Sequence, residues 1–302
     1  MARIVVVGSS NTDMVVRVPH LPAAGETVLG GTFVMAAGGK GANQAVAAAR
    51  LEAGVTLVAR VGQDLFGEAA LTGLRREGID TRFITVDPEA ASGIALIYVD
   101  ASGENSIAVA PGANARLSPD DILHARQTIE TADALLLQLE VPLETVLAAA
   151  ETAHRAGVRV ILNPAPSSPL PARLLPCLDV LTPNESEAAF LSGEAGAGER
   201  QAQRLIEQGA GTVIVTLGAQ GALVATSDDA QQVPSFAVKA LDTTAAGDAF
   251  NGGLAVGLAD GMPLAEAARF ANACGALAAM RLGAQPSLPT ASEVRAFLAQ
   301  RR

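Results

Sequence analysis

The stretch "ALLLQLEVPLETVLAAAETAHRAGVRVILNPAP", residues 134–166, contains the pattern that decides the fold. It starts with an apolar strand-like run, continues into an alanine-rich segment with helical spacing, and returns to an apolar run rich in valine and isoleucine. Parallel neighbouring strands need a crossover connection, which is usually a helix. A strand, a helix and a strand in this order therefore predict an α/β unit.

The same alternation extends along the chain on both sides of this stretch. Strands are expected at 3–9, 55–62 and within 211–226, and helices at 41–51, 67–78, 117–132, 248–260 and 263–281. Aromatic residues make up only 3% of a chain that is 49% hydrophobic, so the core consists of small aliphatic side chains. These features predict an α/β fold, a three-layer sandwich whose mostly parallel central sheet is covered by helices on both faces.

Two segments interrupt the alternation. Residues 13–36 contain short strand-like runs and turn residues without a helix, and residues 92–109 resemble a hairpin around "DASGEN". We expect them to form a small protruding β-sheet, a lid on the main sandwich. No linker or repeat divides the chain, so residues 1–302 are expected to form a single domain.

Composition excludes several classes of function. Lysine plus arginine number 21 and aspartate plus glutamate 31, a net charge of −10, which argues against nucleic acid or an anionic membrane as the main partner. The three histidines lack metal-ligand spacing, which disfavours zinc and Ser-His chemistry. Two distant cysteines, no signal peptide and no membrane span predict a cytoplasmic protein.

Residues 38–43, "GGKGAN", precede the first expected helix. They match neither a Walker loop, which needs Ser or Thr after the lysine, nor a dinucleotide-binding glycine pattern. The glycines allow a ligand to approach the backbone, and Lys40 and Asn43 can donate hydrogen bonds to hydroxyl groups. A tight strand-to-helix turn explains the segment equally well.

Residues 242–253, "DTTAAGDAFNGG", favour a catalytic interpretation. The backbone N–H groups of Ala245, Ala246 and Gly247 can form an anion-binding nest at a helix N-terminus. Asp248 can then accept a proton from a hydroxyl while the nest stabilises a transferring phosphoryl group. The alternative is that Asp248 only caps the helix.

Four further strings follow expected strands and give weaker signals. Asn184 and Glu187 in "NESE" can hold a hydrated magnesium ion, although a solvated first helical turn explains them more simply. "TLGAQG" at 216–221 suits a nucleotide or a hairpin turn. Asn11, Asp13 and Glu140 follow strands, where α/β sheets bind ligands, and turn chemistry is the alternative for the first two.

Taken together, "GGKGANQAVAAARL" at 38–51 and "DTTAAGDAFNGGL" at 242–254 resemble the two signatures of the ribokinase family of carbohydrate kinases, the phosphofructokinase B type. "NPAP" at 163–166, "TPNESEA" at 182–188, "TLGAQG" and "GAQPSLP" at 283–289 fall in family order. The resemblance covers essentially the whole chain. It implies ATP-dependent phosphorylation of a sugar's primary hydroxyl, here O5 of D-ribose, with Asp248 as the base.

The resemblance also implies roles for other positions. The anion hole would use the amides of Ala245, Ala246 and Gly247. The sugar would contact Asn11, Asp13, Gly39, Lys40, Asn43, Glu140 and Asp248. The nucleotide and Mg²⁺ would involve Asn184, Glu187, Thr216, Leu217, Gly218, Ala219, Gln220, Gly221, Gly247 and Asn272. A monovalent cation, K⁺, would lie by Asp242, Thr244, Ala278, Arg281, Gly283 and Ser287, several of them through backbone carbonyls.

The family likeness further implies a homodimer that pairs through the lids. Two alternatives remain at this point. The same fold can act on deoxyribose, a nucleoside or another furanose. A non-catalytic sugar-binding regulator is less favoured, because a binding protein has no need for the base at Asp248.

Overall fold

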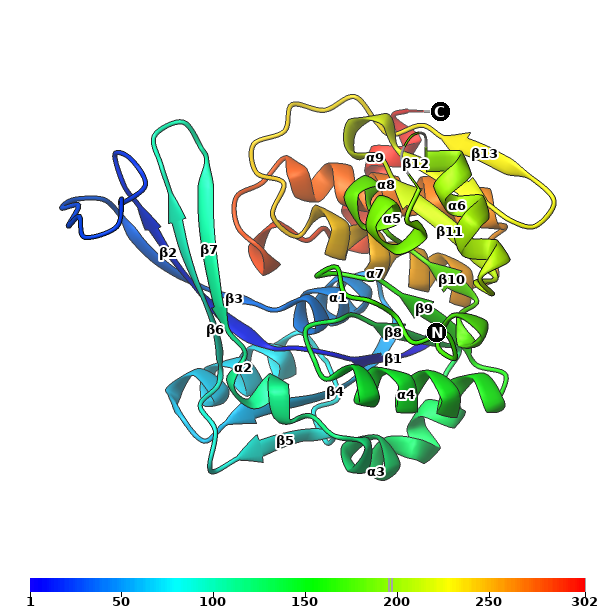
Figure 1. The fold of residues 1–302 in the computed structure, drawn as a ribbon, viewed down its shortest axis with the longest axis horizontal. Coiled ribbons are helices and arrows are strands. Elements are labelled where there is room, and N and C mark those ends of the chain that lie inside the picture. Colours follow the sequence, from blue (N-terminus) through cyan, green and yellow to red (C-terminus); the bar gives the residue numbers. More distant parts are fainter. Residues whose placement is uncertain (195, 197, 302) are drawn as a thin grey trace.

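A computed structural model describes residues 1–194, 196 and 198–301. Its larger sheet has the strand order β13-β12-β11-β10-β9-β8-β1-β4-β5 (Figure 1). The strands are β1 (Arg3–Val7), β4 (Gly54–Gly62), β5 (Ile84–Asp87), β8 (Ala134–Leu137), β9 (Arg159–Leu162), β10 (Val180–Leu181), β11 (Thr212–Thr216), β12 (Ala222–Ala225) and β13 (Ala230–Val233). Strands from β5 to β11 pair in parallel, and β12 and β13 are antiparallel additions at one edge.

Helices cover both faces of this sheet, as the alternation predicts. They are α1 (Lys40–Arg50), α2 (Leu65–Arg76), α3 (Pro119–Glu130), α4 (Leu143–Arg155), α5 (Glu185–Ser192), α6 (Gly198–Glu207), α7 (Ala246–Ala259), α8 (Leu264–Ala279) and α9 (Ala291–Ala299). Among the helices of the described residues, none has both the length and the apolar character needed to span a bilayer.

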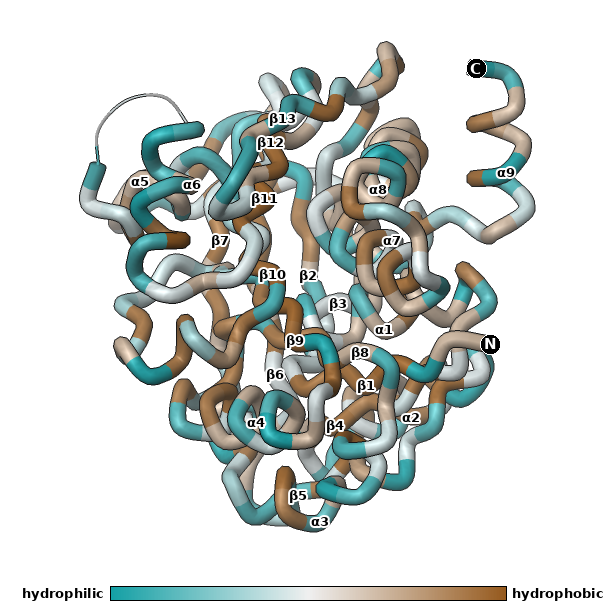
Figure 2. The backbone as a smooth tube through the Cα atoms, turned by 90° about the vertical axis from the view of Figure 1, so that its right-hand side faces the viewer, coloured by the Kyte–Doolittle hydropathy of each residue, from teal (hydrophilic) through white to brown (hydrophobic). Residues whose placement is uncertain are grey.

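The two faces of β1 show how the core is divided. Ile4 and Val6 pack into a cluster with α1, α7 and α8, whereas Val5 and Val7 pack into a second cluster with α3 and α4. Alternate residues of a strand point to opposite faces, so a single buried strand contributes to both layers. Figure 2 shows hydrophobic residues concentrated along the central strands of the larger sheet, such as β1, β8 and β9.

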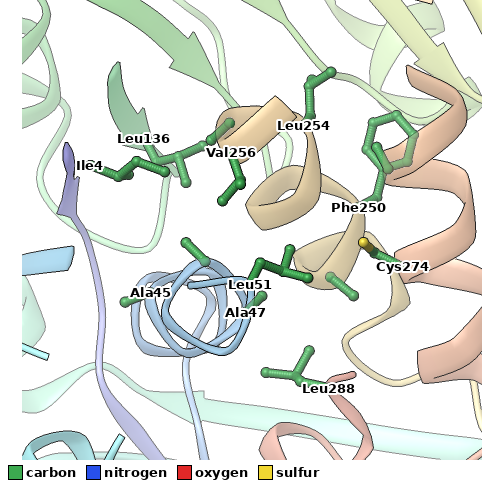
Figure 3. Packing of buried hydrophobic residues seen from close by; sticks show 14 of the residues in the cluster. Ile4, Ala45, Ala47, Leu51, Leu136, Phe250, Leu254, Val256, Cys274 and Leu288 are labelled. Carbon is green, nitrogen blue, oxygen red and sulfur yellow. The ribbon is translucent and has the colours of Figure 1, made fainter. Parts of the chain in front are cut away.

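Helices α1 and α7 pack closely within the first cluster. Figure 3 shows α1, which carries Ala45 and Ala47, beside α7, which carries Leu254 and Val256. Because alanine and glycine dominate both helices, their backbones approach each other closely. This pairing fixes the relative position of the two helix N-termini, which carry the candidate site.

The small sheet has the order β3-β2-β6-β7 and protrudes from the main body (Figure 1). Its strands are β2 (Asn11–Arg17), β3 (Phe33–Gly38), β6 (Gly93–Val99) and β7 (Asn105–Ala110). Strands β6 and β7 form the expected hairpin, in whose turn Asp100 accepts three hydrogen bonds from Ser102 and Glu104. The fold class predicted from the sequence, including this β-sheet, is therefore confirmed.

Candidate active site

The site begins where β1 ends, at the base of the lid. Glu140, which follows β8, accepts hydrogen bonds from the Ser9 hydroxyl and from the backbone N–H of Lys40 at 3.0 Å. The Ser9 hydroxyl in turn accepts from the N–H of Gly41 at 3.3 Å. These bonds hold the N-terminus of α1 against two strand ends, so Lys40 and Glu140 share one corner of the site.

Gly39 is required at this corner. Its φ of 87° lies in the region that favours glycine, and a Cβ there would lie 2.7 Å from the backbone nitrogen of Asn11. The turn therefore brings the start of α1 directly onto the start of the lid strand β2. In this way the structure brings Asn11, Gly39 and Lys40 together.

Asp248 lies in the first turn of α7 and is 6% exposed. Its Oδ2 accepts a hydrogen bond from Nδ2 of Asn43 at 2.9 Å, and its Oδ1 accepts from Nε2 of Gln44 at 3.0 Å. The carboxylate is thus held by two amides of α1 and does not cap its own helix. Ala245 occupies the N-cap position of α7 without a side-chain bond.

The three candidate anion-hole amides are not equivalent. The N–H of Ala246 donates to the carbonyl of Thr243 at 3.1 Å, whereas in the described part of the chain the N–H groups of Ala245 and Gly247 have no such partner. Ala245 has a φ of 58°, in the left-handed region that L-residues rarely adopt. Strain of this kind is typical of functional turns and is not visible in the sequence string.

Charges converge at this point. Burial raises the pKa of Asp248, and the pKa of Asp13 rises to about 6 through burial and then the neighbouring charges of Glu140 and Asp248. Burial opposes the charged form of Lys40, but four surrounding carboxylates outweigh it and raise its pKa. These carboxylates belong to Asp248, Glu140, Glu187 and Asp13. Lys40 therefore stays an ammonium ion at neutral pH.

A cavity of about 530 Å³ opens from Asp248 toward the carboxyl ends of β10 and β11. Its lining joins the base to the predicted nucleotide residues and includes Lys40, Asn163, Thr182, Asn184, Glu187, Thr216, Gly218, Ala245, Gly247, Asp248 and Asn251. Leu217, Ala219, Gln220 and Gly221 lie at or beside the 3-10 turn Gly218–Gln220 without lining it. The cavity thus links the start of α7 to the β11–β12 connection.

Asn184 and Glu187 form a capping box at the start of α5. Asn184 Oδ1 accepts from the N–H of Glu187 at 2.8 Å, and Glu187 Oε2 accepts from the N–H of Asn184 at 2.8 Å. Burial raises the pKa of Glu187. Both residues therefore cap the N-terminus of α5. They also line the cavity, where a carboxylate fits a hydrated Mg²⁺ ion.

Asn272 lies on α8, outside the cavity lining, and is 5% exposed. Its Nδ2 donates to the carbonyls of Val233 at 3.0 Å and Pro234 at 3.3 Å. Asn272 therefore holds the segment after β13 in place. An influence on a nucleotide would act through the shape of that segment.

The segments predicted to hold a monovalent cation lie together. Asp242 Oδ1 accepts from the N–H of Thr244 at 2.9 Å, and Oδ2 accepts from the N–H of Gly283 at 2.8 Å. The N–H of Asp242 donates to the carbonyl of Ala279 at 3.2 Å, beside Ala278. The Arg281 side chain forms an ion pair with Glu293, so the backbone carbonyl oxygen of Arg281 is the group that can act as a ligand for the cation. A carboxylate on a loop that lies beside the last turn of α8 offers the kind of oxygen ligands that K⁺ prefers.

Sequence reasoning missed several polar residues that the structure places at the site. They are Ser9, Gln44, Asn114, Gln138, Asn163, Thr182 and Asn251, all buried. The available signal was a polar residue at the end of an apolar run, as in "LLLQLE" for Gln138. A buried polar side chain requires a hydrogen-bond partner, but the sequence does not say which one.

Comparisons with known proteins agree with this geometry. The model of the pfkB family carbohydrate kinases matches residues 1–291. Ribokinase of Haemophilus influenzae is 43% identical over 297 residues, covering 97% of each chain, and deoxyribokinase of Salmonella typhi is 38% identical over 98% of each. The crystal structure of ribokinase from Thermotoga maritima superposes with a TM-score of 0.93 at 40% identity, covering 99% of this chain and 100% of that one. Arabidopsis thaliana ribokinase complexed with ribose and ATP superposes with a TM-score of 0.91 at 33% identity over 99% of each chain.

Proposed function

The chain belongs to the pfkB family of carbohydrate kinases, and from this premise we propose that it transfers the γ-phosphoryl group of ATP to the 5-hydroxyl of D-ribose. The products are D-ribose 5-phosphate and ADP. The observation that carries the proposal is the buried carboxylate of Asp248, which lies between the amides of α1 and a cavity that reaches β11. The ribokinases among its relatives support ribose as the sugar.

In this reaction Asp248 accepts the proton of the sugar hydroxyl as the oxygen attacks the γ-phosphorus. The bond between that phosphorus and the bridging oxygen of ADP breaks, and the electron pair leaves with ADP. The start of α7 lies beside the reacting group, so the free N–H groups of Ala245 and Gly247 are available to the charge on the transferred phosphoryl oxygens. Ala246 contributes by fixing the turn, through its bond to Thr243.

The sugar side of the site suits a neutral polyol. We assign Asn11, Asp13, Gly39, Lys40, Asn43 and Glu140 to ribose. Lys40 is an obligate donor and the carboxylates are acceptors, so hydroxyl groups can satisfy both kinds of partner. The Oδ1 atom of Asn43 is buried without a hydrogen-bond partner in the described chain, and a sugar hydroxyl would complete it.

The nucleotide side extends from Asn184 and Glu187 to the segment from Thr216 to Gly221, with Asn272 behind it. Mg²⁺ neutralises phosphate charge in transfers of this kind. Glu187 is a carboxylate of the cavity lining that would orient it. We also assign K⁺ to the loop of Asp242, Thr244, Ala278, Arg281, Gly283 and Ser287, so turnover in choline-only buffer should fall well below turnover in potassium buffer.

We also infer a homodimer in which two copies pair through their lids. In each copy, residues 1–302 would form one catalytic domain. Register places Val15, Val34, Ile97 and Ile107 in one row across the four strands, on the face that also carries Asp13. Val34 and Ile107 are exposed, an apolar area that a second copy would bury while closing over the sugar. Ile107→Lys should give a monomer in light scattering, and Leu96→Lys, on the opposite face, should not.

The protein is assigned to the cytoplasm, because its two cysteines are free and buried, as in a reducing compartment. Fractionation of cells that express the tagged chain tests this assignment. Recovery with the membrane or secreted fraction would contradict it.

Asp248→Asn tests the catalytic proposal. The variant keeps the size of the side chain but removes the base, so kcat should fall by about 10²- to 10⁴-fold while ribose binding by calorimetry remains. Asp260→Asn, at the exposed C-terminal end of α7, is the matched control and should be unchanged. Full turnover by the Asp248 variant would remove the base from the mechanism.

A second candidate substrate is 2-deoxyribose, because the Salmonella typhi deoxyribokinase is also a full-length relative. An ADP-release assay with ribose, 2-deoxyribose, fructose and nucleosides separates the candidates. We expect the highest kcat/KM with ribose. A preference for any other sugar would retain the kinase and change its substrate.

A further inference from the structure

A chain of buried hydrogen bonds starts at the carboxylate of Asp248. Nε2 of Gln44 donates to Asp248 Oδ1 at 3.0 Å and also to Asn163 Oδ1 at 3.2 Å. Nε2 of Gln138 donates to Gln44 Oε1 at 2.6 Å. Gln44 and Gln138 have no exposed surface, so water does not compete for these bonds. Both N–H donors of the Gln44 amide and one of the two acceptor positions on its oxygen are therefore used inside the protein.

The chain continues through two strand ends and returns to α7. Nδ2 of Asn163, after β9, donates to the Thr182 carbonyl at 3.2 Å, and the Thr182 hydroxyl donates to Asn251 Oδ1 at 2.6 Å. Nδ2 of Asn251 then donates to the carbonyl of Gly247 at 2.8 Å. The chain thus starts at Asp248 and ends at the residue before it, closing a ring around the first turn of α7.

The ionised carboxylate determines the direction of this ring. An aspartate anion only accepts hydrogen bonds, so Gln44 must present its NH₂ group to it. The Oε1 atom of Gln44 then faces Gln138, and the carbonyl oxygen of Asn163 must face Gln44. Each later amide has only one consistent orientation. If the Asp248 carboxylate were displaced, one N–H of Gln44 would lose its acceptor, and the ring offers no other acceptor for it.

We propose that Gln44 is a positioning residue of the phosphoryl transfer, holding Asp248 as an oriented anion and connecting it through Asn163, Thr182 and Asn251 to the backbone of Gly247. The inference rests on the proposed function, in which Asp248 is the base. Gln44 does not touch the substrate in this assignment. It controls the protonation and the orientation of the Asp248 carboxylate. The bond between Thr182 and Asn251 instead helps to hold the backbone turn at Gly247.

The charged groups that face Asp248 must be considered in any titration. Lys40 comes from α1, Glu140 from the segment after β8, and Asp13 from the lid strand β2. Glu187 on α5 faces Lys40. Gln44 is a neutral donor among these charges, so replacing it leaves the net charge of the site unchanged. A change in the titration of Asp248 can then be assigned to the lost hydrogen bond.

The experiment compares Gln44→Met with Gln201→Met. Gln201 is also a buried glutamine, and its Nε2 donates to two backbone carbonyls, those of Glu194 and Gly196, away from the ring. The side-chain carboxyl of Asp248 is followed by ¹³C NMR with labelled aspartate, its signal being assigned by its loss in Asp248→Asn. We expect Gln44→Met to move the Asp248 titration upward by about one pH unit or more, and Gln201→Met to leave it in place.

The acid limb of kcat against pH should move with the NMR titration in Gln44→Met, and the KM for ribose should change little. Thr182→Val removes the donor to Asn251 with nearly the same shape, so kcat should fall by about tenfold at every pH, with the Asp248 titration unmoved. An unmoved titration in folded Gln44→Met would overturn the proposal. If that variant fails to fold, unchanged kcat in Thr182→Val overturns it.

The two proposals fail in different ways. If the wild-type protein does not phosphorylate ribose, the proposed function fails, while the NMR titration still tests whether Gln44 holds the Asp248 anion. If wild-type turnover is high and the Gln44→Met titration equals that of the wild type, only the role of Gln44 is lost.

Discussion

Gly252 of α7 marks a close approach between the two helices that build the site. A Cβ at this position would lie 2.6 Å from Cβ of Ala47, and 3.1 Å from both the nitrogen of Ala48 and the carbonyl oxygen of Gln44. Two of these three atoms belong to the backbone of α1, which cannot rotate away. Gly252→Ala therefore has to push α1 and α7 apart.

The size of the effect follows from contact distances. Carbon atoms in good contact lie roughly 3.5–4.0 Å apart, so the helices must separate by about 1 Å. Overpacking of this kind costs about 1–3 kcal/mol, which lowers Tm by roughly 2–6 °C in a chain of this length. The catalytic effect should be larger, because α1 carries Lys40, Asn43 and Gln44 while α7 carries Asp248. A misplacement of about 1 Å in a site can reduce the rate on the order of 10²-fold.

The assay is a coupled measurement of ADP release at saturating ribose and ATP, with Tm measured by differential scanning fluorimetry. Gly73→Ala in α2 is the matched control, because a Cβ there meets nothing within 4 Å. It should raise stability by about 0.5–1 kcal/mol, as alanine does in an open helical position, and leave kcat unchanged. If Gly252→Ala keeps kcat within about twofold of wild type, the spacing of α1 and α7 does not control the site.

Two further predictions concern backbone strain and protonation. Ala245→Gly should leave Tm unchanged or raise it slightly, because relief of the left-handed alanine, about 1 kcal/mol, offsets the backbone entropy of glycine. Ala249→Gly in the same helix is the control and should lower Tm. Equal losses of Tm in the two variants would contradict the claim that Ala245 is strained. Asp13→Asn should stabilise the ligand-free protein at pH 8 but not at pH 4. Burial, followed by the charges of Glu140 and Asp248, raises the pKa of Asp13 to about 6. The folded state therefore holds the Asp13 proton more tightly than the unfolded state does. As a result, the folded protein loses stability as pH rises from about 4 to 6. Urea unfolding at both pH values measures the difference, and a gap independent of pH would refute this reading.

Much of the fold follows from local patterns. The buried runs of β1, β4, β8 and β11 and the helices between them are visible as alternating apolar segments, and the crossover rule then gives a parallel sheet. The strands β5 and β13 and the helices α6 and α9 were not predicted. The two strands lie at opposite edges of the sheet and are short, so their sequences carry little of the continuous apolar signal of a buried strand.

The candidate site was predictable only where a motif carried it. Asp248 and Lys40 stand out among glycine and alanine, and the structure brings them to one cavity. Gln44 lies one residue beyond the predicted contact at Asn43, yet its partners are Asn163 and Gln138, 119 and 94 positions away. Such pairings depend on the sheet order, which no local string contains. The left-handed backbone of Ala245 was also hidden, because alanine normally indicates the opposite conformation.

The balance of charge in the site bears on how the reaction ends. Lys40 is the cation that faces Asp13, Glu140, Glu187 and Asp248, and these carboxylates raise its pKa. A neutral sugar enters such a site without electrostatic opposition, and its hydroxyl groups replace water as hydrogen-bond partners. After transfer the sugar carries a phosphate group beside the same carboxylates, and like charges repel. These carboxylates therefore favour the unphosphorylated sugar over the product, and their repulsion of the phosphate opposes the attraction that Lys40 and the N–H groups of Ala245 and Gly247 exert on it.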